Sequence, residues 1–181
     1  MKLQEHCLTC IYDQTKRVCE LLNVDEQQAQ KIDCLAHAKI ATFDMNQTPP
    51  HNAAPLYEAM ADVLGVHDLY AQFKADSSEK AKAFLPLCEQ KIKASSHKLF
   101  EATKTAVAGN VIDLAAVMLY DLEEELEKIY HTPFAIDDFV LLEQQLAHTQ
   151  TLVYLADNAG EEIFDKLYIQ TIKELFPQIN V

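Results

Sequence analysis

The chain has 181 residues, of which 49% are hydrophobic and 24% charged, a composition typical of a globular protein with a core of ordinary size. Its net charge of −13 argues against a nucleic-acid partner, because so acidic a surface repels a phosphate backbone. No apolar run approaches membrane-spanning length and the start of the chain does not resemble a signal peptide, so we expect no membrane association and a cytoplasmic location. The five cysteines are then expected to be thiols or metal ligands.

Helical patterns dominate most of the chain. Glycine is scarce, with three residues, while Ala, Leu, Glu and Lys are frequent. Apolar spacing and cap signals predict helices over 3–22, over 26–43 with Asp25 as N-cap, from Asn52 or Ala53 to Gly65, and over 67–93. Further helical stretches are expected within 93–110 (ending near Gly109), 110–133 and 136–149.

The pattern changes near the end of the chain. The run "TLVYLAD" at 151–157 is short and β-rich, which predicts a buried strand. An amphipathic helix is expected over 161–176, and "QINV" at 178–181 has the character of a second strand. We therefore expect a mainly α protein, with a helical domain at 1–148 and the beginning of an α/β domain at 149–181. One strand and one helix cannot bury both faces of a sheet, so we expect either an N-terminal piece of a larger α/β protein or a sheet completed by another chain.

One group of candidate site residues follows the predicted strand: Asp157, Asn158, Gly160, Glu161 and Asp165. A carboxylate and a carboxamide at the end of a strand suit a hard divalent cation such as Mg²⁺ or Mn²⁺. The helix N-terminus that comes next offers backbone N–H groups to an anion. The alternative is an ordinary turn between a strand and a helix, with Asp and Asn as capping residues.

Two other patterns could carry chemistry. Asn110 and Asp113 lie three residues apart after Gly109, so they share one helix face and could line a pocket, although Gly-Asn is also a common helix boundary. Cys7 with Cys10, and Cys34 with His37, have the spacing of zinc ligands. The alternative for the cysteines is that they are buried or free thiols.

Three stretches together resemble the metal-dependent damage-control phosphatase family, long catalogued as domain of unknown function eighty-nine and also named after an acidic-residue methyltransferase-like protein. They are "CLTC" at 7–10, "GNVIDLA" at 109–115 and "YLADNAGEEIFDKLYI" at 154–169. The CxxC is similar to that of the bacterial and archaeal branch, and the resemblance covers essentially the whole chain. It implies a helical N-terminal domain packed on a doubly wound α/β domain with a parallel sheet.

The resemblance also implies an activity, the hydrolysis of phosphate from small phosphorylated metabolites with Mn²⁺, Co²⁺, Ni²⁺ or Mg²⁺. By motif match, Asp157 and Asn158 are the catalytic metal ligands. Asn110, Asp113 and Glu161 are implied to lie near the substrate and its phosphate. In such proteins a glycine-rich segment with a further aspartate, and later basic residues, complete the site.

This sequence departs from the family pattern, because it reaches Val181 before any such segment. We therefore expect the metal site to be half built in this chain. The competing hypotheses are a non-catalytic helical interaction module, or a half-protein that associates with itself or with a partner chain through the incomplete sheet at 152–156. A small zinc-stabilised domain that uses Cys7, Cys10, Cys34 and His37 is the third hypothesis.

Overall fold

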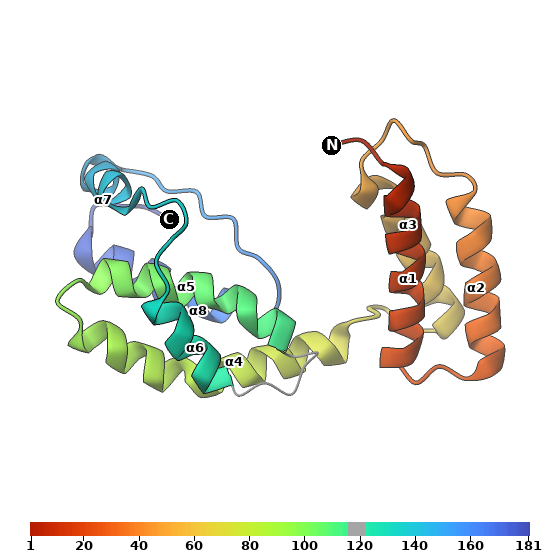
Figure 1. Ribbon diagram of the computed structural model, residues 1–181, viewed down its shortest axis with the longest axis horizontal. Helices are drawn as coiled ribbons and strands as arrows, with labels where there is room; N and C mark the ends of the chain where they lie inside the picture. The colour runs from red at the N-terminus through yellow and green to blue at the C-terminus, as the bar shows by residue number, and fades with distance from the viewer. Residues whose placement is uncertain (116–121) are drawn as a thin grey trace. The chain divides into compact units, whose positions relative to one another are not determined.

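The structure, a computed structural model, describes the chain except for residues 116–121, and it describes side chains outside 110–126. The predicted helical stretch over 110–133 falls partly on residues outside this description. The chain divides into two compact units, Met1–Ala71 and Gln72–Val181 (Figure 1). No helix in the described residues has the length and apolar character needed to cross a membrane.

The first unit is a bundle of three helices, α1 (Glu5–Leu21), α2 (Glu26–Ile40) and α3 (Pro49–Leu64). Consecutive helices run in opposite directions (Figure 1). Asp25 caps α2 as predicted, because its carboxylate accepts the backbone N–H of Gln28 at 2.8 Å. The core of the unit is apolar and is drawn from all three helices, with Val18, Ile32, Leu56 and Met60 among its most buried side chains.

Helix α3 begins three residues before the earliest predicted start. Thr48 is its N-cap, and both Pro49 and Pro50 lie in the first turn. Proline is tolerated there because the first backbone N–H groups of a helix have no intrahelical partner. The helix ends as predicted at Gly65, whose φ of 67° is the left-handed conformation that a C-cap requires.

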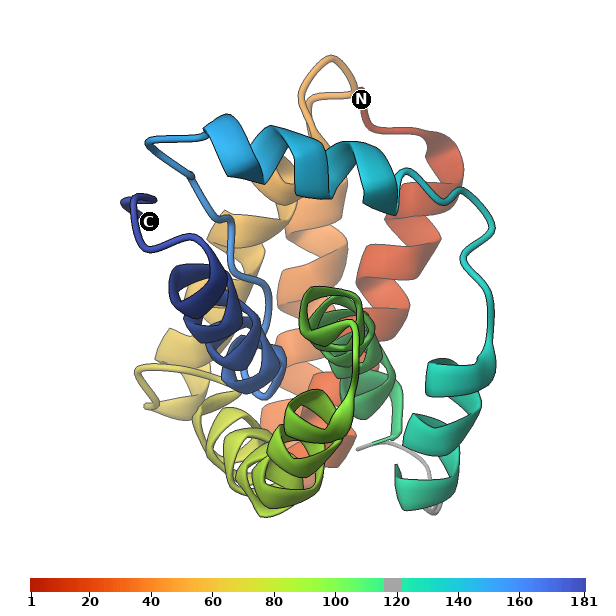
Figure 2. The same cartoon turned by 90° about the vertical axis from the view of Figure 1, so that its left-hand side faces the viewer.

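The described residues of the second unit form five helices, α4 (Ala71–Ala94), α5 (Lys98–Ala115), α6 (Leu122–His131), α7 (Phe139–His148) and α8 (Glu161–Leu175). Helices α5 and α8 lie side by side (Figures 1 and 2). Phe164, Leu167 and Ile172 of α8 belong to one buried apolar cluster, which also contains Leu99 and Ala102 of α5. Helix α5 continues through Gly109, where the sequence predicted its end.

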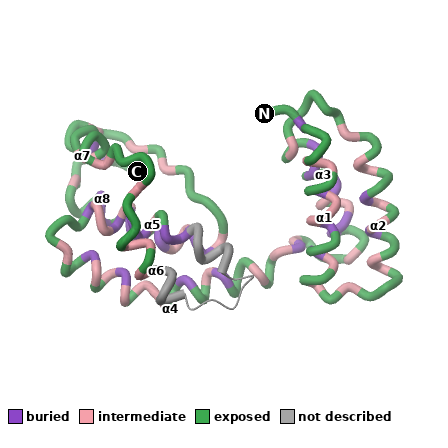
Figure 3. The backbone as a smooth tube through the Cα atoms, in the orientation of Figure 1, coloured by how far each residue is buried: buried purple, intermediate pink, exposed green. Residues whose placement is uncertain are grey.

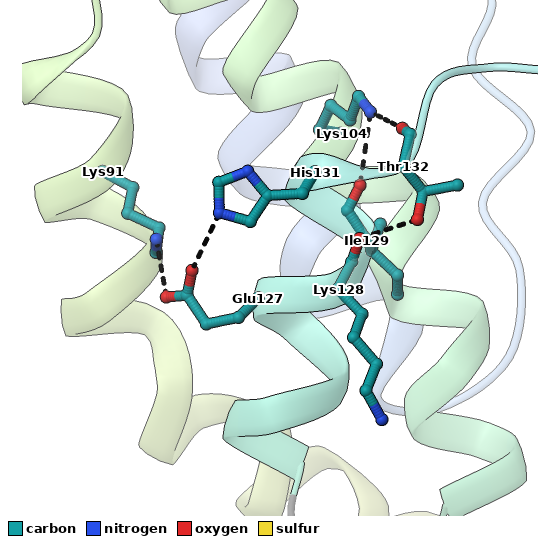
Figure 4. A network of polar contacts seen from close by, with 7 residues as sticks. All are labelled: Lys91, Lys104, Glu127, Lys128, Ile129, His131 and Thr132. Carbon is teal, nitrogen blue, oxygen red and sulfur yellow. Dashed lines mark hydrogen bonds and ion pairs between the residues drawn. The ribbon is translucent and has the colours of Figure 1, made fainter.

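A buried lysine ties α6 to α5 (Figure 4). The ammonium group of Lys104 donates to the backbone carbonyls of Ile129 and Thr132, at the C-terminal end of α6. Only 3% of Lys104 is exposed, so this capping of the negative end of α6 takes place away from bulk water. On the other side, Glu127 of α6 pairs with Lys91 of α4 at 2.7 Å. The two lysines therefore fix α6 against its neighbours.

The mainly α prediction is confirmed, but the predicted α/β part is wrong for this structure. The described residues contain no strand, and the sole β-type pairing among them is an isolated parallel bridge between Thr151 and Asn180. A strand exists only when a neighbouring strand continues the ladder. The segment 178–181 pairs through Asn180 alone, so the run 152–156 lacks the hydrogen bonds that define a strand.

The segment 149–181 shares a core with α4 and α5. Leu152 and Tyr154 pack against the buried cluster that contains Cys88, Leu99 and Phe164. The domain boundary that the sequence predicts at residue 148 stays a prediction. The two compact units of the structure meet at a different position, near residue 71.

Candidate functional site

The first turn of α8 is the centre of the candidate site. Gly160 stands at the N-cap with a φ of 98°, a conformation that side-chain-bearing residues rarely adopt. The carbonyl of Asn158 accepts the backbone N–H groups of Glu161 at 3.1 Å and of Glu162 at 3.3 Å. These bonds fold the "DNAGEE" segment into a tight turn, so that Asp157 and Asn158 sit directly before the positive end of α8.

Two glycines let this turn approach α4 and α5. A Cβ atom at Gly160 would lie 3.2 Å from the carbonyl oxygen of Ser77 in α4. A Cβ atom at Gly109 would lie 3.3 Å from the Cα of Glu161. Gly109 is thus a contact point inside α5 rather than its end, and it brings the "GNVIDLA" stretch against the "DNAGEE" turn.

The structure brings Asn158 and Glu161 together. The side-chain amide of Asn158 donates to the Glu161 carboxylate at 3.2 Å. Glu161 is only 3% exposed, whereas Asp157 and Asn158 are both exposed. The predicted pair of metal ligands therefore lies at the surface, above a buried carboxylate that holds Asn158 in place.

Asn110 and Asp113 both lie in α5, and their side chains fall outside the described part of the structure. The described part shows the residue that precedes Asn110 in α5. Gly109, which precedes Asn110, faces Glu161 and Phe164 of α8. The two predicted substrate residues therefore follow directly on the point where α5 meets the candidate site.

Sequence reasoning missed two serines of α4 that complete the surroundings of the turn. Ser78 donates its hydroxyl hydrogen to one carboxylate oxygen of Glu162 at 2.8 Å. The other carboxylate oxygen of Glu162 and the hydroxyl of Ser77 are buried with no hydrogen-bond partner among the described residues. The sequence signal for these two residues is a Ser-Ser pair within a helical pattern. Such a pair does not indicate which residues the serines contact.

The sequence grouped Asp165 with the candidate site residues after the predicted strand, but its side chain instead contacts Tyr154. It is nearly buried, and it accepts a hydrogen bond from the Tyr154 hydroxyl at 2.5 Å. Burial raises the pKa of Tyr154, and the hydrogen bond with Asp165 raises it further. Asp165 thus anchors the run 152–156 to α8.

The raised pKa of Tyr154 predicts alkaline sensitivity. The folded state holds the phenol proton more tightly than the unfolded state, in which the pKa is near 10.0, so its stabilising effect is complete below that value and declines as the pH rises above it. We expect Tyr154→Phe to lower the free energy of unfolding by about 1–3 kcal/mol at neutral pH, because Asp165 loses its partner. Urea unfolding from neutral pH to about pH 11 should then show a shallower alkaline decline for the variant. Parallel profiles for the two proteins would contradict this assignment.

The donor set fits part of a hard-cation site. Asp157 and the side-chain oxygen of Asn158 are ligand types that Mg²⁺ and Mn²⁺ accept, but octahedral coordination needs about six oxygens. No group of three or more His, Cys, Asp or Glu side chains that could hold a metal ion occurs within the described ranges. The residues present therefore supply a fragment of a site.

The zinc site expected in the first unit stays a prediction. Cys7, Cys10, Cys34 and His37 are not part of any such metal-holding group among the described residues, and the described cysteines form no disulfide. The ring of His37 instead lies 4.7 Å from that of Tyr12, whose hydroxyl donates to Asp33 at 2.6 Å. The hydrogen bond to Asp33 raises the pKa of Tyr12.

A surface hollow lies away from the turn. It has a volume of about 500 Å³ and is lined by residues of α4, α8 and the start of α5, among them Lys93, Lys98 and Lys173. Its lining includes neither Asp157 nor Asn158. The candidate site is therefore a surface turn rather than a deep pocket.

These features define a helical protein whose candidate site combines a helix N-terminus, where anions bind, with side-chain oxygens of Asp157 and Asn158, which are ligand types of hard cations. The family comparison identifies it more closely. The chain belongs to the family of the damage-control phosphatase ARMT1-like domain, whose family model matches residues 3–181. Members of this family are damage-control phosphatases, and the family is metal-dependent.

The chain is similar to several archaeal proteins. A damage-control phosphatase of Pyrococcus horikoshii is 32% identical over 178 residues, which are 97% of this chain and 61% of that protein. A damage-control phosphatase of Archaeoglobus fulgidus is 27% identical over 178 residues, covering 96% of this chain and 61% of that protein. The crystal structure of a DUF89 family protein from Pyrococcus horikoshii matches with a TM-score of 0.86 and 30% identity, over 100% of this chain and 63% of that one. The chain thus spans about three-fifths of the length of these relatives.

Proposed function

We propose that this chain carries the first part of a divalent-metal-dependent phosphatase site that acts on small phosphorylated metabolites. The observation that carries the proposal is the meeting of two motifs about fifty residues apart, at the contact between Gly109 of α5 and Glu161 of α8. Sequence similarity identifies each motif separately, and the contact of Gly109 with Glu161 supports the proposal that they belong to one site. Family membership supplies the reaction class.

Each residue then has a proposed role. Asp157 and Asn158 hold the cation through their side-chain oxygens. The cation, Mn²⁺, Co²⁺, Ni²⁺ or Mg²⁺, neutralises phosphate charge and helps to activate water when bound. Glu161 keeps the Asn158 amide nitrogen occupied at 3.2 Å, which leaves the side-chain oxygen of Asn158 free to face a ligand. Asn110 and Asp113 contact the substrate at the rim.

Metal binding is the direct test. We expect Asp157→Ala to weaken the binding of Mn²⁺ by about tenfold or more, because the only charged ligand proposed here is removed, as measured by titration calorimetry. Asp138→Ala is a matched control, since Asp138 is also exposed, precedes a helix and caps no backbone N–H through its side chain. Equal Mn²⁺ affinity for Asp157→Ala and the unchanged chain would remove this placement of the site.

Turnover is a separate question from binding. Hydrolysis of a generic phosphomonoester such as p-nitrophenyl phosphate is assayed with each of the four cations. The assay distinguishes a site that is active in this chain from a site that only binds metal. Turnover that is lost in Asp157→Asn supports a site that functions in this chain. Metal binding without turnover supports a site that needs further groups, which agrees with the three-fifths coverage of the relatives.

A second function is favoured by one specific observation, the exposure of Val153 and Leu155 beside the site. Large apolar side chains that project from an extended run are typical of a surface that binds another polypeptide. On this reading the chain is a helical half-protein or interaction module. The two functions are compatible, because the same polypeptide could complete the metal site.

A further inference from the structure

Glu162 of α8 connects the candidate site to α4 through two contacts. Its backbone N–H donates to the carbonyl oxygen of Asn158 at 3.3 Å, which helps to close the turn before the helix. Its side chain contacts the other helix, where one carboxylate oxygen accepts the hydroxyl hydrogen of Ser78 at 2.8 Å. One residue therefore bonds both to α4 and to the turn that carries the proposed metal ligands.

The hydrogen bond from Ser78 holds the Glu162 side chain in place. Within the described part of the chain, no other group donates to this carboxylate and no cationic side chain pairs with it. Its second oxygen is buried without a hydrogen-bond partner. Because a hydrogen bond to a charged group is about twice as strong as one between neutral groups, the loss of this one bond should release the side chain.

Helix α4 also contacts the turn one residue earlier, at Ser77. The carbonyl oxygen of Ser77 lies 3.2 Å from the Cβ position at Gly160. The hydroxyl of Ser77 is buried and has no hydrogen-bond partner among the described residues. Ser77 thus contacts the turn without using its hydroxyl, whereas the contact of Ser78 depends on its hydroxyl.

The proposed metal ligands depend on contacts of this kind, because packing does little to fix their positions. Residues 155–158, which lead into α8, are all exposed (Figure 3). The carbonyl of Asn158 is held by the backbone N–H groups of Glu161 and Glu162. A site binds its ligand more tightly when its groups are held in place beforehand. What holds Glu162 therefore also affects Asp157 and Asn158.

We propose that Ser78 and Glu162 are positioning residues, which hold the turn of Asp157 and Asn158 against α4 and so raise its affinity for a divalent cation. The effect on the cation rests on the proposed function, whereas the hold on the turn does not. The alternative is that Glu162 is an ordinary acidic residue in the first turn of a helix, where it suits the helix dipole. On that alternative the Ser78 hydroxyl has no effect on the turn.

Hydrogen exchange of the chain tests the hold on the turn. Ser78→Ala removes the donor, and Ser78→Thr retains a hydroxyl at the same position. We expect exchange at the amides of Glu161 and Glu162 to speed up about tenfold in Ser78→Ala and to return close to the original rate in Ser78→Thr. The amide of Phe176, at the other end of α8, should keep its rate in both variants.

Ser77→Ala is the matched control on the same helix, since it removes a neighbouring hydroxyl that has no described partner. Exchange at the turn should stay unchanged in this variant, and an equal effect of the two alanine changes would overturn the proposal. Titration calorimetry should show an affinity for Mn²⁺ about tenfold lower in Ser78→Ala, unchanged in Ser77→Ala and restored in Ser78→Thr. A small loss of general stability does not produce this pattern, because nearly all of the chain stays folded.

Three further outcomes would overturn the proposal. The first is unchanged exchange at the turn in Ser78→Ala. The second is equal acceleration at Phe176, which would mean that the bond supports only the general stability of α8. The third is an affinity for Mn²⁺ that Asp157→Ala lowers and Ser78→Ala retains.

The proposed function fails separately from this proposal. If Asp157→Ala binds Mn²⁺ as well as the unchanged chain does, the turn is not the metal site. The exchange rates then still decide whether Ser78 and Glu162 hold the turn against α4.

Discussion

Replacing Gly160 by alanine should lower the free energy of unfolding of the second unit by about 2–5 kcal/mol. Two costs add at this position. Its φ of 98° is strained for any residue with a side chain, and the new methyl group would lie 3.2 Å from the carbonyl oxygen of Ser77. Because the obstacle is helix backbone rather than the end of a flexible side chain, α4 or the turn must move to relieve it.

Gly65→Ala separates the two costs. Gly65 also has a positive φ, of 67°, but nothing lies within 4 Å of its Cβ position. It should therefore carry the conformational cost alone, about 1–2 kcal/mol. Urea denaturation followed by circular dichroism gives both values. Equal losses for the two variants would show that the contact with Ser77 contributes nothing.

Gly160→Ala should also disturb the candidate site. The Asn158 carbonyl accepts two backbone hydrogen bonds across this turn, so a displacement of the turn moves Asp157 and Asn158 together. We expect Mn²⁺ affinity to fall in Gly160→Ala while Gly65→Ala retains it. Unchanged affinity in a destabilised Gly160→Ala would mean that the metal site lies elsewhere.

Truncating Phe164 to alanine should cost about 3–5 kcal/mol, one of the largest losses expected from a single change in this chain. Its side chain is fully buried, at 0% exposure, and lies in the cluster that joins α8 to α4 and α5. It also lies 3.5 Å from the Cβ position at Gly109. The cavity left by the ring therefore opens at the contact between the two motif-bearing helices.

Leu155→Ala is the matched apolar control. Leu155 belongs to the same unit but is 88% exposed, so its truncation should change the free energy of unfolding by no more than about 0.5 kcal/mol. A loss near that of Phe164→Ala would mean that Leu155 is covered in solution, by another copy or by part of the chain. Denaturation at several protein concentrations distinguishes those two cases.

The sequence alone determined the features that depend on neighbours along the chain. Asp25 as an N-cap and Gly65 as a C-cap are local, because a cap satisfies backbone groups only a few residues away. The mainly helical character follows from apolar spacing in the same way. Family membership was also readable, since the "DNAGEE" and "GNVIDLA" motifs are contiguous stretches.

The tertiary structure alone decided what depends on contacts between distant segments. Gly109 had the sequence signature of a helix end, yet α5 continues through it, and its lack of a side chain makes room for α8. The run 152–156 has the composition of a strand, but a strand also requires a partner, and Asn180 provides one bridge. Ser78 and Glu162 are 84 residues apart, and only packing brings them within 2.8 Å. Such pairings depend on which surfaces meet in the folded chain, and a local sequence pattern does not indicate which surfaces these are.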